Sequence, residues 1–156
     1  MASSSEGLRI GIQVVLGLII VALAYWLYIS ITEPYKVILR EERATDMTRL
    51  RMDHIRQAMI RFEADSSRFP MTLDSLVMYV KEDSAVRADA QDLFGTSFES
   101  FNPDSLPFSP RTGERFELTV NDTSQVKTYL LEDPNSDDYI GTTAGDVTQL
   151  NAASWE

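Results

Sequence analysis

The sequence contains no cysteine, and this absence removes several kinds of chemistry at once. A chain without thiols has no disulfides, no cysteine-ligated metal site and no thiol nucleophile. His54 is the only histidine, so a catalytic triad or a zinc site would have to be built around that single side chain. Because His54 lies in a helical pattern beside Asp53, we expect it to be a solvated residue on a helix surface.

The motifs of common enzymes are missing as well. The chain has no G-x-S-x-G nucleophile turn and no glycine-rich phosphate loop. Each common reaction therefore lacks at least one residue type that it needs. We expect a protein that is not an enzyme, binds no cofactor and takes no small-molecule substrate.

Basic residues are scarce in the C-terminal part. Residues 1–61 hold 8 Lys and Arg against 6 Asp and Glu, whereas residues 62–156 hold 6 against 18, and together they give the net charge of −10. Contacts to phosphate require cations, so the acidic part excludes nucleic acid as a partner. Excess acid of this kind keeps an exposed domain soluble.

Charged residues are absent altogether from Ile10 to Ile31. At about 1.5 Å per residue these 22 residues would form a helix about 33 Å long, enough to cross a hydrocarbon core of ~30 Å. The run ends in "AYWLYIS", which is a poor cleavage site and is typical of an interfacial aromatic belt. The sequence therefore predicts a retained, single transmembrane helix.

Glycine and proline are both absent from Tyr35 to Asp65, directly after Pro34. Apolar residues recur there at the three- and four-residue spacing of a helix face, from Val37 to Phe62. Proline suits the first turn of a helix and bends a helix interior, so we expect a restart or a bend at Pro34. A helix of this length cannot bury its own apolar stripe, which must pack on its domain, on neighbouring copies, or on both.

The remainder reads as a small domain. Thr72 has the position of an N-cap for a short helix over residues 73–80, and residues 82–107 read as a loop held to the core by phenylalanines. Alternating apolar residues predict strands over residues 116–120 and 126–131, joined by a turn.

The predicted fold is α+β: a transmembrane helix continues into a long amphipathic helix packed on a small antiparallel sheet. The predicted segments are an N-terminal stretch (1–9), the transmembrane helix (10–32), the amphipathic helix (33–67), an α+β domain with a C-terminal hairpin (68–141) and a flexible tail (142–156).

One stretch, "DPNSDD" from Asp133, resembles the start of a calcium loop, with oxygen ligands at alternating positions. Asp138 replaces the usual turn glycine, and Ala144 stands where the bidentate glutamate would be. The stretch is therefore either an acidic turn after a strand or a weak calcium site formed by Asp133, Asn135 and Asp137.

The candidate partner-docking residues lie on the two long helical segments, and they are Gln13, Trp26, Met47, Ile55, Met59 and Phe62. Gln13 is the polar exception within the apolar run, where it could bond to a partner helix or lie near the headgroups.

The order of these segments resembles the type IV pilin and type II secretion pseudopilin family. The likeness covers residues 10–134 and is closest in "IRQAMIRFEADSSRFPMTLDSLVMYV", with Phe62, the "ADSS" break and Phe69-Pro70. The resemblance implies a pilin-like structural or assembly subunit. The chain departs from the family at its processing motif, because Gly7 precedes Leu8 and Ile12 stands at the position of the family's glutamate. We therefore expect no prepilin-type cleavage.

Two arguments give opposite answers for the side of the membrane on which the C-terminal domain lies. Lys36, Arg40, Arg43 and Arg49 follow the apolar run and only Arg9 precedes it, which by the positive-inside rule places the C-terminal part in the cytoplasm. The resemblance implies export, and we predict a bacterial inner-membrane protein with a periplasmic domain.

The alternative function is an accessory subunit of a respiratory or photosynthetic membrane complex, docked through Gln13, Trp26 and the helix stripe. In either case the expected partners are the membrane and other protein subunits.

Overall fold

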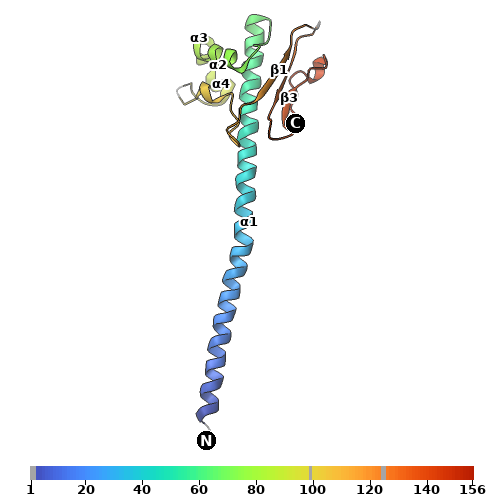
Figure 1. Cartoon of the computed structure of the whole chain (residues 1–156). Coiled ribbons are helices and arrows are strands. Elements are labelled where there is room, and N and C mark those ends of the chain that lie inside the picture. Colours follow the sequence, from blue (N-terminus) through green and yellow to red (C-terminus); the bar gives the residue numbers. More distant parts are fainter. Residues whose placement is uncertain (1–2, 99, 124–125) are drawn as a thin grey trace. The chain divides into compact units, whose positions relative to one another are not determined.

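The computed structural model describes the backbone of residues 3–98, 100–123 and 126–156, with the side chains of these residues except 3–6, 33 and 34 (Figure 1). The chain divides into two compact units, residues 1–43 and residues 44–156. The elements in chain order are α1 (Ser3–Ser66), α2 (Leu73–Glu82), α3 (Ser84–Ala88), α4 (Ala90–Phe94), the 3-10 helix η1 (Pro103–Ser105), β1 (Glu117–Asn121), β2 (Thr128–Glu132), β3 (Tyr139–Gly141) and the 3-10 helix η2 (Val147–Gln149).

Helix α1 contains the whole apolar run and the whole amphipathic segment. It ends where the sequence predicts, because Ser67 has a left-handed φ of 55° and donates its N–H to the carbonyl of Glu63 at 2.7 Å. The sequence predicted a restart or a bend at Pro34, and no restart occurs there, because α1 is a single helix from Ser3 to Ser66. The predicted division between the two helical segments lies at residues 32–33, whereas the compact units meet at residues 43–44.

The short helix α2 follows its prediction closely. Thr72 has extended backbone and its side-chain oxygen accepts from the N–H of Ser75 at 3.2 Å, which satisfies one unpaired donor of the first turn. The helix buries one apolar face, made of Leu73, Leu76, Val77 and Val80.

The segment 82–107 is not the single long loop that the sequence predicted, since it contains α3, α4 and η1. Asp83 starts α3 by accepting from the N–H groups of Ala85 and Val86 at 2.7 and 3.0 Å. The expected anchoring by phenylalanine is confirmed: Phe94 is buried and stacks on Phe101 with ring centroids 4.2 Å apart.

The three strands form one antiparallel sheet in the order β1-β2-β3. The predicted hairpin is present as β1 and β2, with Leu118 opposite Leu131 and Val120 opposite Tyr129. Strand β3 was not predicted, because its three residues are too few to show alternation.

The tail over residues 142–156, predicted to be flexible, packs on the domain instead. Ala153 is buried and forms a bridge with Ile140, and Gly141 donates its N–H to the carbonyl of Ala152 at 2.9 Å. These contacts add a short piece of chain along the outer edge of β3. The absence of periodicity hid this packing, because single bridges leave no repeating pattern in a sequence.

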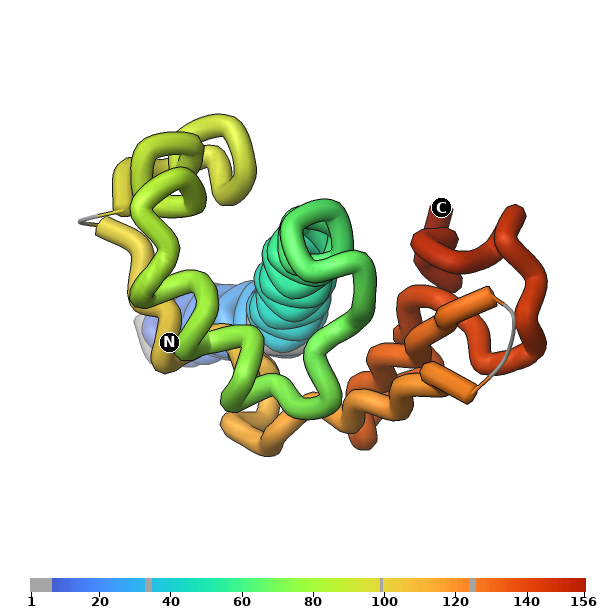
Figure 2. The backbone as a smooth tube through the Cα atoms, turned by 90° about the horizontal axis from the view of Figure 1, so that it is seen from above, coloured from blue at the N-terminus to red at the C-terminus, as the bar shows by residue number. Residues whose placement is uncertain are grey.

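Within residues 44–156 the distal part of α1 lies between the short helices on one side and the strands on the other (Figures 1 and 2). Met52, Ile55 and Met59 of α1 share one core with Tyr129 and Leu131 of β2. The α+β fold predicted from the sequence is therefore confirmed: a long N-terminal helix packs with a small antiparallel sheet.

Candidate interaction surfaces

The apolar run of α1 has no protein covering within the described residues. The helix is long and apolar enough to cross a membrane, and its most apolar 18-residue window has a mean hydropathy of 2.5. Gln13 and Trp26 are exposed in this unit, Trp26 by 69%. This part of α1 supports membrane association on length and composition.

Further along α1, the structure separates residues that the sequence pattern had grouped together. Ile55 and Met59, predicted to contact a partner, are fully buried in the protein's own core. Phe62 packs against the same core, with its ring 4.9 Å from that of Tyr79. We therefore correct the docking prediction for Ile55 and Met59, because a side chain enclosed by its own domain has no surface left for a partner. Phe62 is half-buried, and its docking role stays a prediction.

Met47 and Leu50 behave differently. Their side chains are 58% and 55% exposed, although they lie on the helix that buries Met52 and Ile55. A helix turns by 100° per residue, so Met47 and Leu50 fall on a face turned away from the core stripe. We name the exposed surface of these two residues the docking face, after the docking role predicted for Met47. The sequence predicted Met47 as a docking residue, and Leu50 belongs to the same apolar stripe from Val37 to Phe62.

A groove borders the docking face. It has a volume of about 280 Å³, and its apolar walls come from Met47, Leu50, Phe101 and Leu106. The polar part of its lining is made of Arg51, His54, Ser100, Asn102 and Ser105. His54 is half-buried, with the rings of Phe94 and Phe101 edge-on at 5.6 and 5.8 Å. The prediction of a solvated histidine was therefore wrong, because Phe94 and Phe101 pack against its ring.

Electrostatics at His54 follow from this packing. Burial lowers the pKa of the imidazole below its ordinary value of 6.5, and neighbouring Arg51 lowers it further, against an opposing contribution from Asp53. The neutral form of His54 is therefore favoured in the folded protein.

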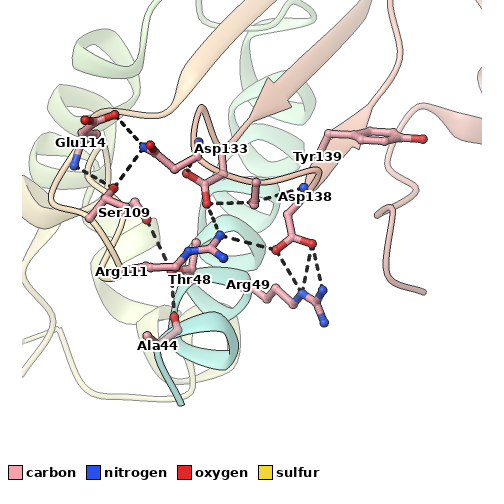
Figure 3. A network of polar contacts seen from close by, with 12 residues as sticks. Ala44, Thr48, Arg49, Ser109, Arg111, Glu114, Asp133, Asp138 and Tyr139 are labelled. Carbon is pink, nitrogen blue, oxygen red and sulfur yellow. Dashed lines mark hydrogen bonds and ion pairs between the residues drawn. The ribbon is translucent and has the colours of Figure 1, made fainter. Parts of the chain in front are cut away.

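A polar network ties α1 to the turn after β2 (Figure 3). Arg49 on α1 forms an ion pair with Asp138 at 2.9 Å, and Arg111 forms one with the fully buried carboxylate of Asp133. Thr48 and Ser109 bring their hydroxyl oxygens within 3.4 Å, which joins the helix to the loop before β1.

This network gives the predicted calcium ligands other partners. Asp133 accepts from Arg111 and Ser136, the side-chain amide of Asn135 donates to Glu114 at 2.6 Å, and Asp137 is exposed. No group of three or more acidic or histidine side chains suited to a metal ion occurs among the described residues. An arginine supplies the positive charge beside Asp133, which favours the acidic turn over the weak calcium site among the two predicted alternatives.

The C-terminal residues are also anchored by arginine. Arg56 donates to both carboxylate oxygens of Glu156, at 2.8 and 3.1 Å, and the guanidinium of Arg49 lies 5.3 Å from the ring centre of Trp155. Donation from Arg56 lowers the pKa of the Glu156 carboxyl below its ordinary value. No sequence signal pointed to these contacts, because the partners lie far apart in the chain, Arg56 and Glu156 by 100 residues.

Comparison of the chain with protein-family models, with curated protein sequences and with solved structures gives no match. The functional argument therefore rests on the surfaces described above.

Proposed function

We propose that this protein is a non-enzymatic, single-pass membrane protein that acts as a pilin-like structural or assembly subunit of an envelope complex. One observation carries the proposal: α1 buries Met52 and Ile55 in its own domain and leaves Met47 and Leu50 open. A helix that had only to hold the domain together would not need large apolar side chains on that outer face. Isolated exposed apolar residues are common on protein surfaces, but here they border a groove.

The proposed mechanism is packing rather than chemistry. The apolar run of α1 inserts into the bilayer, where Trp26 lies near the headgroups and Gln13 is available to a partner helix. The docking face contacts a neighbouring subunit, and the acidic surface of residues 62–156 keeps the domain in water.

Native mass spectrometry after gentle detergent extraction from the native membrane tests this proposal. A series of homopolymers would support the pilin-like subunit. A fixed set of other subunits would instead support the accessory role in a larger membrane complex. Recovery of a lone monomer at all protein concentrations would contradict both.

We further propose that the protein resides in a bacterial inner membrane with residues 44–156 in the periplasm. The chain has no cysteine, so an Asp122→Cys variant carries a single thiol in the exposed turn after β1. A membrane-impermeant maleimide should label this thiol in intact cells. Labelling only after the cells are broken would place the domain in the cytoplasm, as the positive-inside count suggests.

A further inference from the structure

The groove beside the docking face combines apolar walls with a cation. Met47, Leu50, Phe101 and Leu106 line it together with Arg51. None of the described residues that line it is acidic. This is unusual for the surface of residues 44–156, where 20 Asp and Glu stand against 10 Lys and Arg.

Arg51 is held in place without a carboxylate. One of its terminal nitrogens, Nη1, donates to the carbonyl oxygens of Ser105 and Phe108 at 3.2 and 3.0 Å. Within the described part of the chain no ion pair joins it to an acidic side chain, and burial lowers its pKa. By contrast Arg49, Arg56 and Arg111 each face an acidic partner.

The neighbouring acid does not supply the missing charge. Asp53 is close in sequence, but its carboxylate lies 2.5 Å from the guanidinium of Arg56. A guanidinium has five N–H donors in a planar fork that matches the two oxygens of a carboxylate. With Nη1 engaged by two carbonyls, Arg51 is oriented in advance and retains donors for an incoming anion.

We propose that this groove docks a segment of a partner protein in which an Asp or Glu carboxylate lies next to an apolar side chain. The carboxylate pairs with Arg51, and the apolar side chain packs against Met47 and Leu50. Ser100, Asn102 and Ser105 also line the groove, but Met47, Leu50, Phe101 and Leu106 offer a bare phosphate no favourable contact and suit an apolar side chain beside the carboxylate. The inference rests on the proposed docking function and specifies the chemistry of the partner.

His54 provides a direct reporter of the groove, because it lines the groove and is the only histidine. The experiment uses the full chain in detergent, with the imidazole observed by ¹H–¹³C NMR. The probes are two blocked dipeptides, acetyl-Leu-Glu-amide and acetyl-Leu-Gln-amide, which differ only in charge. We expect the Glu peptide to shift the His54 signal in a saturable way and to bind at least about 10-fold more tightly than the Gln peptide, a difference of about 1.4 kcal/mol.

Two variants complete the experiment, each checked for folding by circular dichroism. Arg51→Gln should abolish the preference for the Glu peptide, and the exposed Arg68→Gln should leave it unchanged. Equal binding of the two peptides, no shift with either, or an unaltered preference in Arg51→Gln would overturn the inference. Assembly seen by native mass spectrometry would survive in that case, so a failure here is distinct from a failure of the proposed function.

Discussion

Among the glycines, Gly141 is the one at which the fold leaves no room for a side chain. Its φ is +88°, and a Cβ there would lie 2.3 Å from the carbonyl oxygen of Tyr129 and 3.0 Å from that of Leu150. The close approach lets β2, β3 and the C-terminal segment pack together. Backbone atoms cannot move aside as the end of a flexible side chain can.

We therefore expect Gly141→Ala to lower the free energy of unfolding by at least about 2 kcal/mol, through clash and backbone strain together. Gly113→Ala is the matched control, because Gly113 also has a positive φ, +75°, but open space around it. It should cost about 1 kcal/mol, the strain of an L-residue in the left-handed region. Urea unfolding of the full chain followed by circular dichroism measures both, and equal losses would contradict the packing described here.

Asp133 is a buried carboxylate, and its ion pair with Arg111 supports the stability of the fold. Removing Arg111 would leave its carboxylate enclosed and unpaired, which typically costs about 3–5 kcal/mol. We expect the double variant Arg111→Met with Asp133→Asn to be more stable than Arg111→Met alone, since it removes the unpaired charge. The same urea experiment tests this, and a double variant less stable than the single one would refute the pairing.

His54 should make stability depend on pH. Its pKa is lower in the folded protein than the unfolded value of about 6.5, so the unfolded chain binds the proton more readily. The resulting stabilisation is complete above pH 6.5 and is lost as the pH falls through the folded pKa. Urea midpoints should therefore decline from pH 7.5 to pH 5.5, and His54→Phe should flatten this decline. A His54 NMR titration midpoint above 6.5 would contradict the burial argument.

At the scale of elements, the spacing of apolar residues predicted the helices and strands that are long enough to show a repeating pattern. The extent of α1, the face of α2 and the β1–β2 hairpin all follow from apolar spacing or from an N-cap residue. Periodicity could not tell which apolar residues of α1 face the domain. That depends on the segment over residues 82–107, whose helices of five residues or fewer leave no pattern of their own.

The distinction between the core stripe and the docking face can be measured on α1 itself. Ile55→Ala should cost about 2–5 kcal/mol, because it opens a cavity in a fully buried position. Leu50→Ala, on the same helix, should change stability by no more than about 0.5 kcal/mol. Thermal and urea unfolding of both variants would settle this, and comparable losses would mean that Leu50 is covered by the domain.

At the scale of the whole molecule, composition predicted a helix apolar and long enough to cross a membrane, followed by an acidic part. The contacts within the domain had to come from the structure. The uncharged run and the acidic C-terminal part are plain in the sequence. Long-range pairs such as Arg49 with Asp138 and Arg56 with Glu156 are not, because a single sequence does not show which charges meet. These pairs hold the turn after β2 and the C-terminal residues against α1.

The central claim is that Met47 and Leu50 contact another subunit of a membrane-anchored assembly. Site-specific photo-crosslinking in the native membrane tests it most directly, with benzoyl-phenylalanine placed at either position in the full chain. Met71 and Met78, which are 62% and 59% exposed, are the control positions. The account predicts a crosslinked adduct of one discrete mass from positions 47 and 50 and none from 71 and 78. No adduct at all, or equal adducts from all four positions, would contradict it.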